Sequence, residues 1–286
     1  MPYIGRFAPS PSGRLHFGSV VSAVGSYLRA KSQNGIWLIR IEDLDAPRCP
    51  KGMSDTILNE LATLGLYSDK EILIQSRRLE IYQDFLQKLI AQGEAFYCYC
   101  TRAQLKTTPC TCFFKKQNCE AKSSIRFKPL QDYSLSFYDE LLGQIHCFKP
   151  QQFVTLQRSD GIIAYNLACV IDDALSGVTE VVRGRDLLNV TTIQIKLFES
   201  LNFKAPTFLH LPLALTNLQD KLSKQNHAPA ILDLFPPAQI LIMALEFLGQ
   251  DTSAIKDLTD TQSILKAAIA NFKLENIPKK SSSISF

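Results

Sequence analysis

The chain has 286 residues, of which 46% are hydrophobic and 20% charged, a composition typical of a globular protein and not of a disordered or fibrous one. Its 31 basic and 27 acidic residues leave a net charge of +4 at pH 7, so a nucleic-acid partner would have to bind a local basic patch. The N-terminus lacks the pattern of a signal peptide and no long uncharged apolar stretch occurs, so we expect no membrane span and a reducing cytoplasmic location.

The first 45 residues have the pattern of a strand, a helix and a second strand. The strand is predicted at 3–8, the helix from about Ser19 to just before Gly35, and a buried parallel strand at 36–39. Two polar segments, PSPSGRLHFGS and 42–45, each follow the carboxyl end of a strand. Open α/β sheets bind ligands at that edge, so we expect a ligand site there.

The rest of the chain alternates further helices and strands around one interruption. Helices are predicted near 54–66 and 76–92, strand-like alternation at 124–148, and a second α/β stretch at 153–215 that includes a helix near 191–200. The chain beyond Pro236 is predicted to be helical to about Phe272, and the last eight residues, KKSSSISF, to fray.

The interruption is a cysteine-rich window. Five of the eight cysteines fall in it, at positions 98, 100, 110, 112 and 119. In a reducing compartment a cluster of thiols indicates a metal site more than a disulfide framework. The histidines at 146, 210 and 227 have no such partner pattern, and we interpret them as structural.

Two segments point to phosphate chemistry, each weakly when taken singly. The loop PSPSGRLHFGS has neither the dinucleotide nor the P-loop glycine pattern, but it places a histidine at a helix start, where anions are favoured. It is equally consistent with a proline-rich turn. The segment KLSKQ offers two cations and a hydroxyl, although two such lysines are more often a solvated surface.

Together these segments resemble the paired nucleotide-binding signatures of class I aminoacyl-tRNA synthetases, and RFAPSPSG resembles their glutamyl branch. Three further segments, 40–45, 164–173 and 182–187, match that branch in the same order, so the resemblance covers most of 3–226. It implies an α/β fold with a Rossmann-like catalytic domain, which joins ATP and glutamate into glutamyl adenylate.

The resemblance also implies roles for individual residues. ATP, accompanied by Mg²⁺, would be held by His16, Gly18, Ser19, Lys221, Ser223 and Lys224, of which His16 and Lys224 would be catalytic. Glutamate would be held by Arg6, Phe7, Ala8, Pro9, Ser10, Glu42, Tyr165 and Arg183. Arginines suit the two carboxylates of glutamate and Glu42 suits its ammonium group. Which arginine binds the side-chain carboxylate stays open. Two other interpretations also stay open, in which Glu42 forms a surface salt bridge and Tyr165 is a core aromatic residue.

Some positions depart from the family pattern. Ser19 stands where a second histidine is usual, and Leu222 and Gln225 replace the usual methionine and serine of the second signature. The stretch after Gln225 is too short for the expected anticodon-binding domain. This truncated pattern resembles the glutamyl-queuosine tRNA(Asp) synthetases. It implies glutamate activation without tRNA, followed by transfer to the queuosine base in the anticodon stem-loop of tRNA(Asp).

In that family Cys-x-Cys, a Tyr or Cys, and a final Cys hold one structural zinc ion. Here Cys98, Cys100, Cys112 and Cys119 match best, with Cys110 as the substitute for Cys112. The alternative is a set of incidental reduced thiols.

The predicted organisation is a first half of the catalytic domain at 1–95, a zinc insertion at 96–125, a second half at 126–226 and a helical C-terminal region at 227–286. We expect a monomer. Two other functions stay open: a minimal synthetase that charges a tRNA 3′ end, and an inactive tRNA-binding paralogue.

Overall fold

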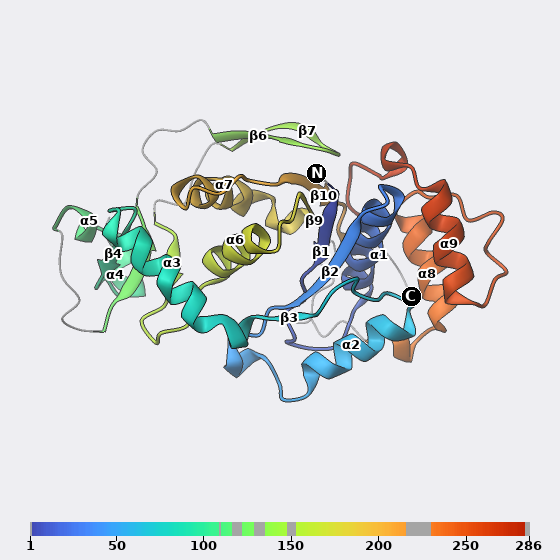
Figure 1. Cartoon of the computed structure of the whole chain (residues 1–286), viewed down its shortest axis with the longest axis horizontal. Coiled ribbons are helices and arrows are strands. Elements are labelled where there is room, and N and C mark those ends of the chain that lie inside the picture. Colours follow the sequence, from blue (N-terminus) through green and yellow to red (C-terminus); the bar gives the residue numbers. More distant parts are fainter. Residues whose placement is uncertain are drawn as a thin grey trace.

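A computed structural model describes residues 2–108, 110–115, 122–128, 135–147, 153–215 and 230–283. Figure 1 shows a group of central strands with helices on both sides. The strands are β1 (Ile4–Phe7), β2 (Ile36–Ile41), β3 (Leu73–Ile74), β4 (Ala95–Cys98), β5 (Ser124–Phe127), β6 (Leu135–Asp139), β7 (Gly143–Cys147), β8 (Thr155–Gln157), β9 (Glu180–Gly184), β10 (Thr207–Leu211), β11 (Ala214–Leu215) and β12 (Ser282–Ser283). The α-helices are α1 (Phe17–Ser32), α2 (Met53–Thr63), α3 (Leu79–Ala91), α4 (Arg102–Thr107), α5 (Cys112–Lys115), α6 (Tyr165–Leu175), α7 (Thr191–Ser200), α8 (Pro237–Phe247) and α9 (Thr261–Asn271).

Parallel strands form the centre of the molecule. Strand β1 pairs with β2 from Ile4 opposite Ile36, and β2 continues to β3. Strand β9 pairs with β10, which also pairs in parallel with β6 of the β6–β7 hairpin. The two sheets adjoin at β1, where the Thr179 N–H donates to the Ile4 carbonyl at 2.9 Å. This arrangement confirms the predicted Rossmann-like α/β class.

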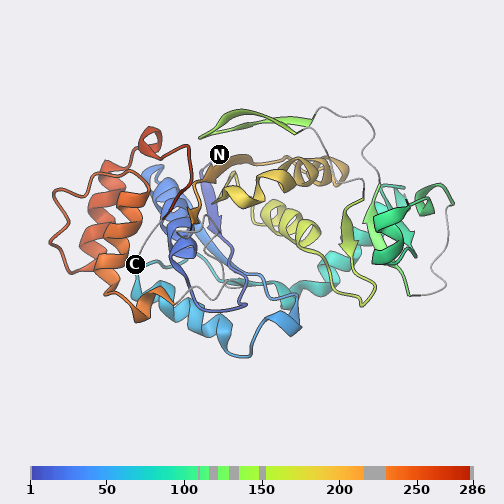
Figure 2. The ribbon, with the colours of Figure 1, turned by 180° about the vertical axis from the view of Figure 1, so that it is seen from behind.

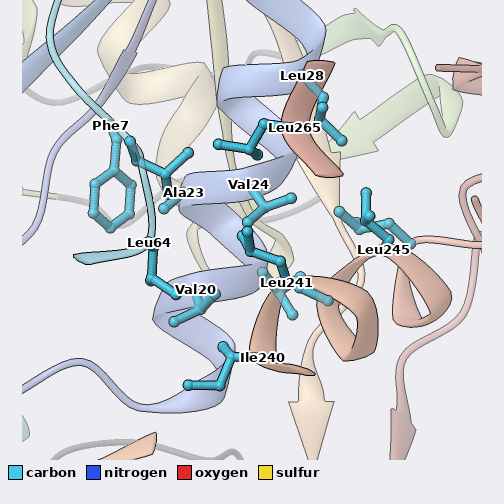
Figure 3. Packing of buried hydrophobic residues seen from close by; sticks show 14 of the residues in the cluster. Phe7, Val20, Ala23, Val24, Leu28, Leu64, Ile240, Leu241, Leu245 and Leu265 are labelled. Carbon is cyan, nitrogen blue, oxygen red and sulfur yellow. The ribbon is translucent and has the colours of Figure 1, made fainter. Parts of the chain in front are cut away.

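Helix α1 crosses the sheet and carries the main core. Its apolar face buries Val20, Val24 and Leu28, which pack against α8 and α9 (Figure 3). Gly25 lets the helix approach β10 closely, because a Cβ there would lie 2.6 Å from a methyl carbon of Leu211. The long apolar contact fixes the start of α1 relative to the strand ends.

The cysteine-rich segment and the C-terminal helices lie at opposite ends of the molecule. Figures 1 and 2 place α4, α5 and β4 at one end and α8 and α9 at the other. Strands β4, β5 and β8 form a separate antiparallel sheet at the cysteine end. Among the described residues, no helix combines the length and the apolar character needed to cross a bilayer.

Most predicted elements are observed within a few residues, and α7 has the predicted bounds. In the described part of the tail, the expected fraying is not observed at Ser282 and Ser283, because β12 pairs in parallel with β11. The Ser281 hydroxyl also accepts a hydrogen bond from the Leu213 N–H at 3.0 Å. Backbone pairing with an open strand edge therefore holds Ser282 and Ser283, a long-range contact that composition does not reveal.

Candidate active site

One cavity of about 390 Å³ lies beyond the carboxyl ends of β1, β2, β9 and β10. It brings together the predicted site residues that the structure describes outside the cysteine window: Arg6, Phe7, Ala8, Pro9, Ser10, His16, Gly18, Ser19, Glu42, Tyr165 and Arg183. Lys221, Ser223 and Lys224 lie outside the described residues. The two polar segments singled out in the sequence thus meet at the sheet edge where ligands bind.

The start of helix α1 faces this cavity. His16 is its N-cap, and its Nδ1 accepts a hydrogen bond from the Ser19 N–H at 3.3 Å. Gly18 and Ser19 in the first turn also line the cavity. Backbone N–H groups and the helix dipole at such a terminus favour an anionic group, as a phosphate requires.

The loops after β1 and β2 are tied to each other across the cavity. The Glu42 N–H donates to the Pro9 carbonyl at 3.0 Å, and the Ser10 hydroxyl donates to the Glu42 carbonyl at 3.1 Å. The Glu42 carboxylate accepts a hydrogen bond from Arg40 at 3.1 Å. Burial raises the pKa of Glu42, although the charges of Arg40 and Arg6 oppose the rise.

Arg6 and Arg40 share a buried carboxylate, that of Asp173. Asp173 accepts two hydrogen bonds from Arg6, at 3.0 and 3.3 Å, and one from Arg40 at 2.5 Å. Burial alone would raise the pKa of Asp173, but the charges of Arg40 and then Arg6 outweigh it and lower the pKa to about 2. Arg6 therefore reaches the cavity as a guanidinium that already has a counter-ion.

Arg183 is the contrasting case. Its guanidinium donates to five acceptors of the protein: His210 Nε2 at 3.1 Å, Tyr165 Oη at 3.4 Å, Gln194 Oε1 at 2.7 Å, Thr191 Oγ1 at 2.7 Å and the Leu187 carbonyl at 3.4 Å. All five are neutral acceptors, and within the described part of the chain no carboxylate pairs with Arg183, which is 5% exposed. A buried guanidinium that no carboxylate contacts directly can bind an anionic group of a ligand.

Tyr165 lies between Arg183 and the Arg6–Asp173 pair. It begins helix α6 and lines the cavity beside Glu42. Burial raises the pKa of its phenol, so the hydroxyl stays neutral and can donate or accept.

Sequence reasoning missed several residues that the structure connects to Arg183. Asp139, Thr191, Gln194 and His210 are all buried around it or one step behind it. The sequence pattern gives His210 no partner and indicates a structural histidine, whereas the structure pairs it with Asp139. Since Asp139 and His210 are far apart in the chain, their pairing follows only from the contact between β6 and β10.

Four thiols of the cysteine-rich segment meet at one point. The Sγ atoms of Cys98, Cys100, Cys110 and Cys112 all lie within 4.8 Å of one another. Two of the pairs, 98 with 110 and 100 with 112, are separated by 3.6 Å. In a tetrahedral zinc site with Zn–S bonds of about 2.3 Å, the sulfurs lie about 3.8 Å apart, so the set fits zinc.

The cluster contains three of the four predicted ligands, Cys98, Cys100 and Cys112, together with Cys110. Cys110 and Cys112 are both in the cluster, whereas the sequence pattern favours one of them together with Cys119. Cys119 lies outside the described residues. The described thiols are thus sufficient for four-coordinate binding without it.

Comparisons with known proteins agree with this geometry. The family model of the class I tRNA synthetases (E and Q), catalytic domain, matches residues 4–111 and 111–282. Relatives named glutamyl-Q tRNA(Asp) synthetase include one from Citrobacter koseri, 44% identical over 98% of this chain and 95% of the relative. Another, from Shewanella amazonensis, is also 44% identical, over 98% of this chain and 96% of its own length. The relative from Escherichia coli K12 is 43% identical, over 97% and 91%.

Solved structures share the fold. A glutamate-tRNA synthetase from Elizabethkingia anophelis superposes with a TM-score of 0.80 at 24% identity, over 100% of this chain and 68% of that one. A glutamate tRNA ligase from Elizabethkingia meningosepticum, in complex with its amino acid, gives 0.81 at 24% identity, over 100% and 67%.

Proposed function

Because the chain belongs to the glutamyl-Q tRNA(Asp) synthetases within the class I tRNA synthetases of the E and Q type, we propose that it activates glutamate with ATP and transfers it to the queuosine base of tRNA(Asp). The observation that carries this proposal is the convergence of the described motif residues on one cavity, beside a buried guanidinium that no carboxylate of the described residues contacts. Both substrates of the first step are anions, and the cavity offers one cationic side and one helix N-terminus.

Glutamate fits the charged groups of the cavity one by one. Arg183 binds the side-chain carboxylate, because it is the guanidinium of the cavity that lacks a counter-ion among the described residues. Glu42 binds the ammonium group, and the Tyr165 hydroxyl bridges toward Arg183 at 3.4 Å. Arg6, balanced by Asp173, contributes shape and hydrogen bonds more than net charge.

ATP binds at the start of α1. His16, Gly18 and Ser19 hold it there, and Lys221, Ser223 and Lys224 complete the phosphate site, as the family resemblance implies. An oxygen of the glutamate α-carboxylate attacks the α-phosphate in line, pyrophosphate leaves, and glutamyl adenylate forms; Mg²⁺ bound with ATP would offset the phosphate charge. The protein contributes positioning and charge stabilisation, with no covalent nucleophile.

In the second step a hydroxyl of the queuosine base attacks the activated carbonyl, and AMP leaves. An ester then joins glutamate to the anticodon of tRNA(Asp). A base splayed out of a stem-loop is a common target of sequence-specific RNA binding, which supports this mode of access.

The four clustered thiols bind one structural zinc ion. The donor set of Cys98, Cys100, Cys110 and Cys112 and its sulfur spacing support this assignment. Zinc would join the end of β4 to the start of α5, and metal-binding free energy would there become folding free energy. Metal binding by four cysteines requires them to be reduced, so this assignment is in keeping with a reducing, cytoplasmic setting.

Glutamate-dependent exchange between pyrophosphate and ATP tests the first step. Zinc-replete protein without RNA should exchange label with glutamate, and only weakly with aspartate or glutamine. Glutamine lacks the carboxylate that Arg183 binds, so it serves as the matched control substrate. The proposal fails if no exchange occurs, or if glutamine supports exchange as well as glutamate does.

A further inference from the structure

Behind Arg183 lies a buried acid–imidazole pair that the proposed reaction does not use directly. His210 on β10 has its Nδ1 2.6 Å from the Asp139 Oδ2 and its Nε2 3.1 Å from the Arg183 Nε. The side chains of Asp139 and His210 are fully buried. A charged or titratable group in such a position requires a reason, because burying it costs free energy.

The geometry determines which nitrogen of His210 carries the proton. Asp139 accepts hydrogen bonds from the N–H groups of Leu141, Leu142 and His210 itself, as an ionised carboxylate does. It therefore requires a hydrogen on Nδ1. The opposite nitrogen, Nε2, is left as the acceptor, and the Arg183 Nε–H donates to it.

The imidazole also stays uncharged. Burial lowers the pKa of His210 and the charge of Arg183 lowers it further, against the opposing effects of Asp139 and Asp186. The Thr191 hydroxyl also lies 3.1 Å from Nε2, and its single hydrogen has both this nitrogen and the Leu187 carbonyl, at 3.3 Å, within reach. A neutral acceptor orients a guanidinium without cancelling its charge, whereas a carboxylate in the same place would supply the counter-ion.

We propose that Asp139 and His210 are positioning residues, which aim the Arg183 guanidinium at the carboxylate of glutamate while leaving its charge available to the substrate. This inference rests on the proposed function of Arg183. It assigns a role to the β6–β7 hairpin, because Asp139 ends β6 opposite Phe208 of β10. The β6–β7 hairpin thus supplies a residue that supports Arg183 through His210.

Two nearly isosteric variants test the proposal in the exchange assay with the full zinc-replete chain. In Asp139→Asn an amide replaces the carboxylate. When its NH₂ group faces His210, Nδ1 must become the acceptor and the ring hydrogen moves to Nε2. The Nε2–H then opposes the Arg183 Nε–H. In His210→Phe the acceptor is lost. Both should raise the KM for glutamate by about 10- to 100-fold, the scale for a hydrogen bond to a charged group, and leave the KM for ATP within about 2-fold.

Three controls separate positioning from a merely structural role. His210→Gln keeps a neutral acceptor and should recover most of the glutamate affinity. Tyr138→Ala changes an exposed residue of the same strand and should leave both KM values unchanged. The double variant Asp139→Asn/His210→Phe should be no worse than His210→Phe alone, because both changes act through Arg183.

The ring can also be observed directly in the unmodified protein. Nitrogen-15 NMR at pH 7 should show His210 neutral with its hydrogen on Nδ1. A ring protonated on Nε2, or on both nitrogens, overturns the proposal even if the variants fail to fold.

Folded variants whose glutamate KM stays within about 2-fold of the unmodified protein also overturn it, as does an equal loss of ATP and glutamate affinity. An unmodified protein inactive in exchange would instead contradict the proposed function, so the two failures are distinguishable.

Discussion

Arg183→Leu should lower kcat/KM for glutamate in the exchange assay by about 100- to 1,000-fold, equivalent to about 3–4 kcal/mol. The substitution removes the buried guanidinium that has no counter-ion among the described residues and leaves the substrate carboxylate in a site with neutral partners. Because the ATP-binding residues at the start of α1 are untouched, the KM for ATP should change little. Steady-state exchange rates at varied glutamate and ATP measure both effects.

Two further variants control for charge and for folding. Arg183→Lys keeps the charge but loses the planar five-donor fork, so it should give an intermediate loss. Arg185 is two residues from Arg183 in the chain, but its side chain does not line the cavity. Arg185→Leu therefore removes a nearby positive charge and should retain the activity. Equal losses in the 183 and 185 variants, with unchanged melting temperatures, would show that Arg183 does not bind glutamate.

Cys110→Ser should reduce the zinc content of the purified protein from about one equivalent to little or none. It removes one of four sulfurs that lie within 4.8 Å of one another, and a three-thiolate set holds structural zinc far more weakly. The melting temperature should fall with the zinc content. Metal analysis together with thermal unfolding of the full chain measures this.

Cys119→Ser is the matched control, since the four described thiols complete the site without it. It should retain about one equivalent of zinc. The opposite pattern, with zinc lost in the 119 variant and kept in the 110 variant, would instead support the ligand set Cys98, Cys100, Cys112 and Cys119 that the sequence pattern favours. Absence of zinc from the unmodified protein would reject the site.

The sequence predicted the site wherever its parts are local. A strand, a proline-rich loop and a helix start in 3–32 place Arg6, Ser10 and His16 by short-range rules, and the structure has these elements where they were expected. Glu42 follows the second strand for the same reason. Parallel strands then bring these chain segments to one edge, as the βαβ pattern requires.

The supporting contacts could not be predicted, because they depend on tertiary register. Arg6 and Asp173 are 167 residues apart, and Asp139 and His210 are 71 apart. No periodicity or spacing connects such pairs. The proposal that Arg183, and not Arg6, binds the side-chain carboxylate of glutamate depends on these contacts, because they show which guanidinium already has a carboxylate partner.

Cysteine spacing was ambiguous for another physical reason. A short loop can fold back in several ways, so five thiols in one window allow more than one tetrahedral set. The structure brings Cys110 back to Cys98, which spacing did not favour. The C-terminal tail shows the same limit, since β12 depends on a distant open strand edge.

Transfer of labelled glutamate to tRNA(Asp) from which the 3′-terminal adenosine has been removed tests the proposed function most directly. Queuosine-containing tRNA(Asp) should still accept the label, in an alkali-labile bond, and an unmodified transcript should accept none. Labelling that disappears with the terminal adenosine, or that does not require queuosine, would contradict transfer to the anticodon base and indicate ordinary charging of a tRNA 3′ end.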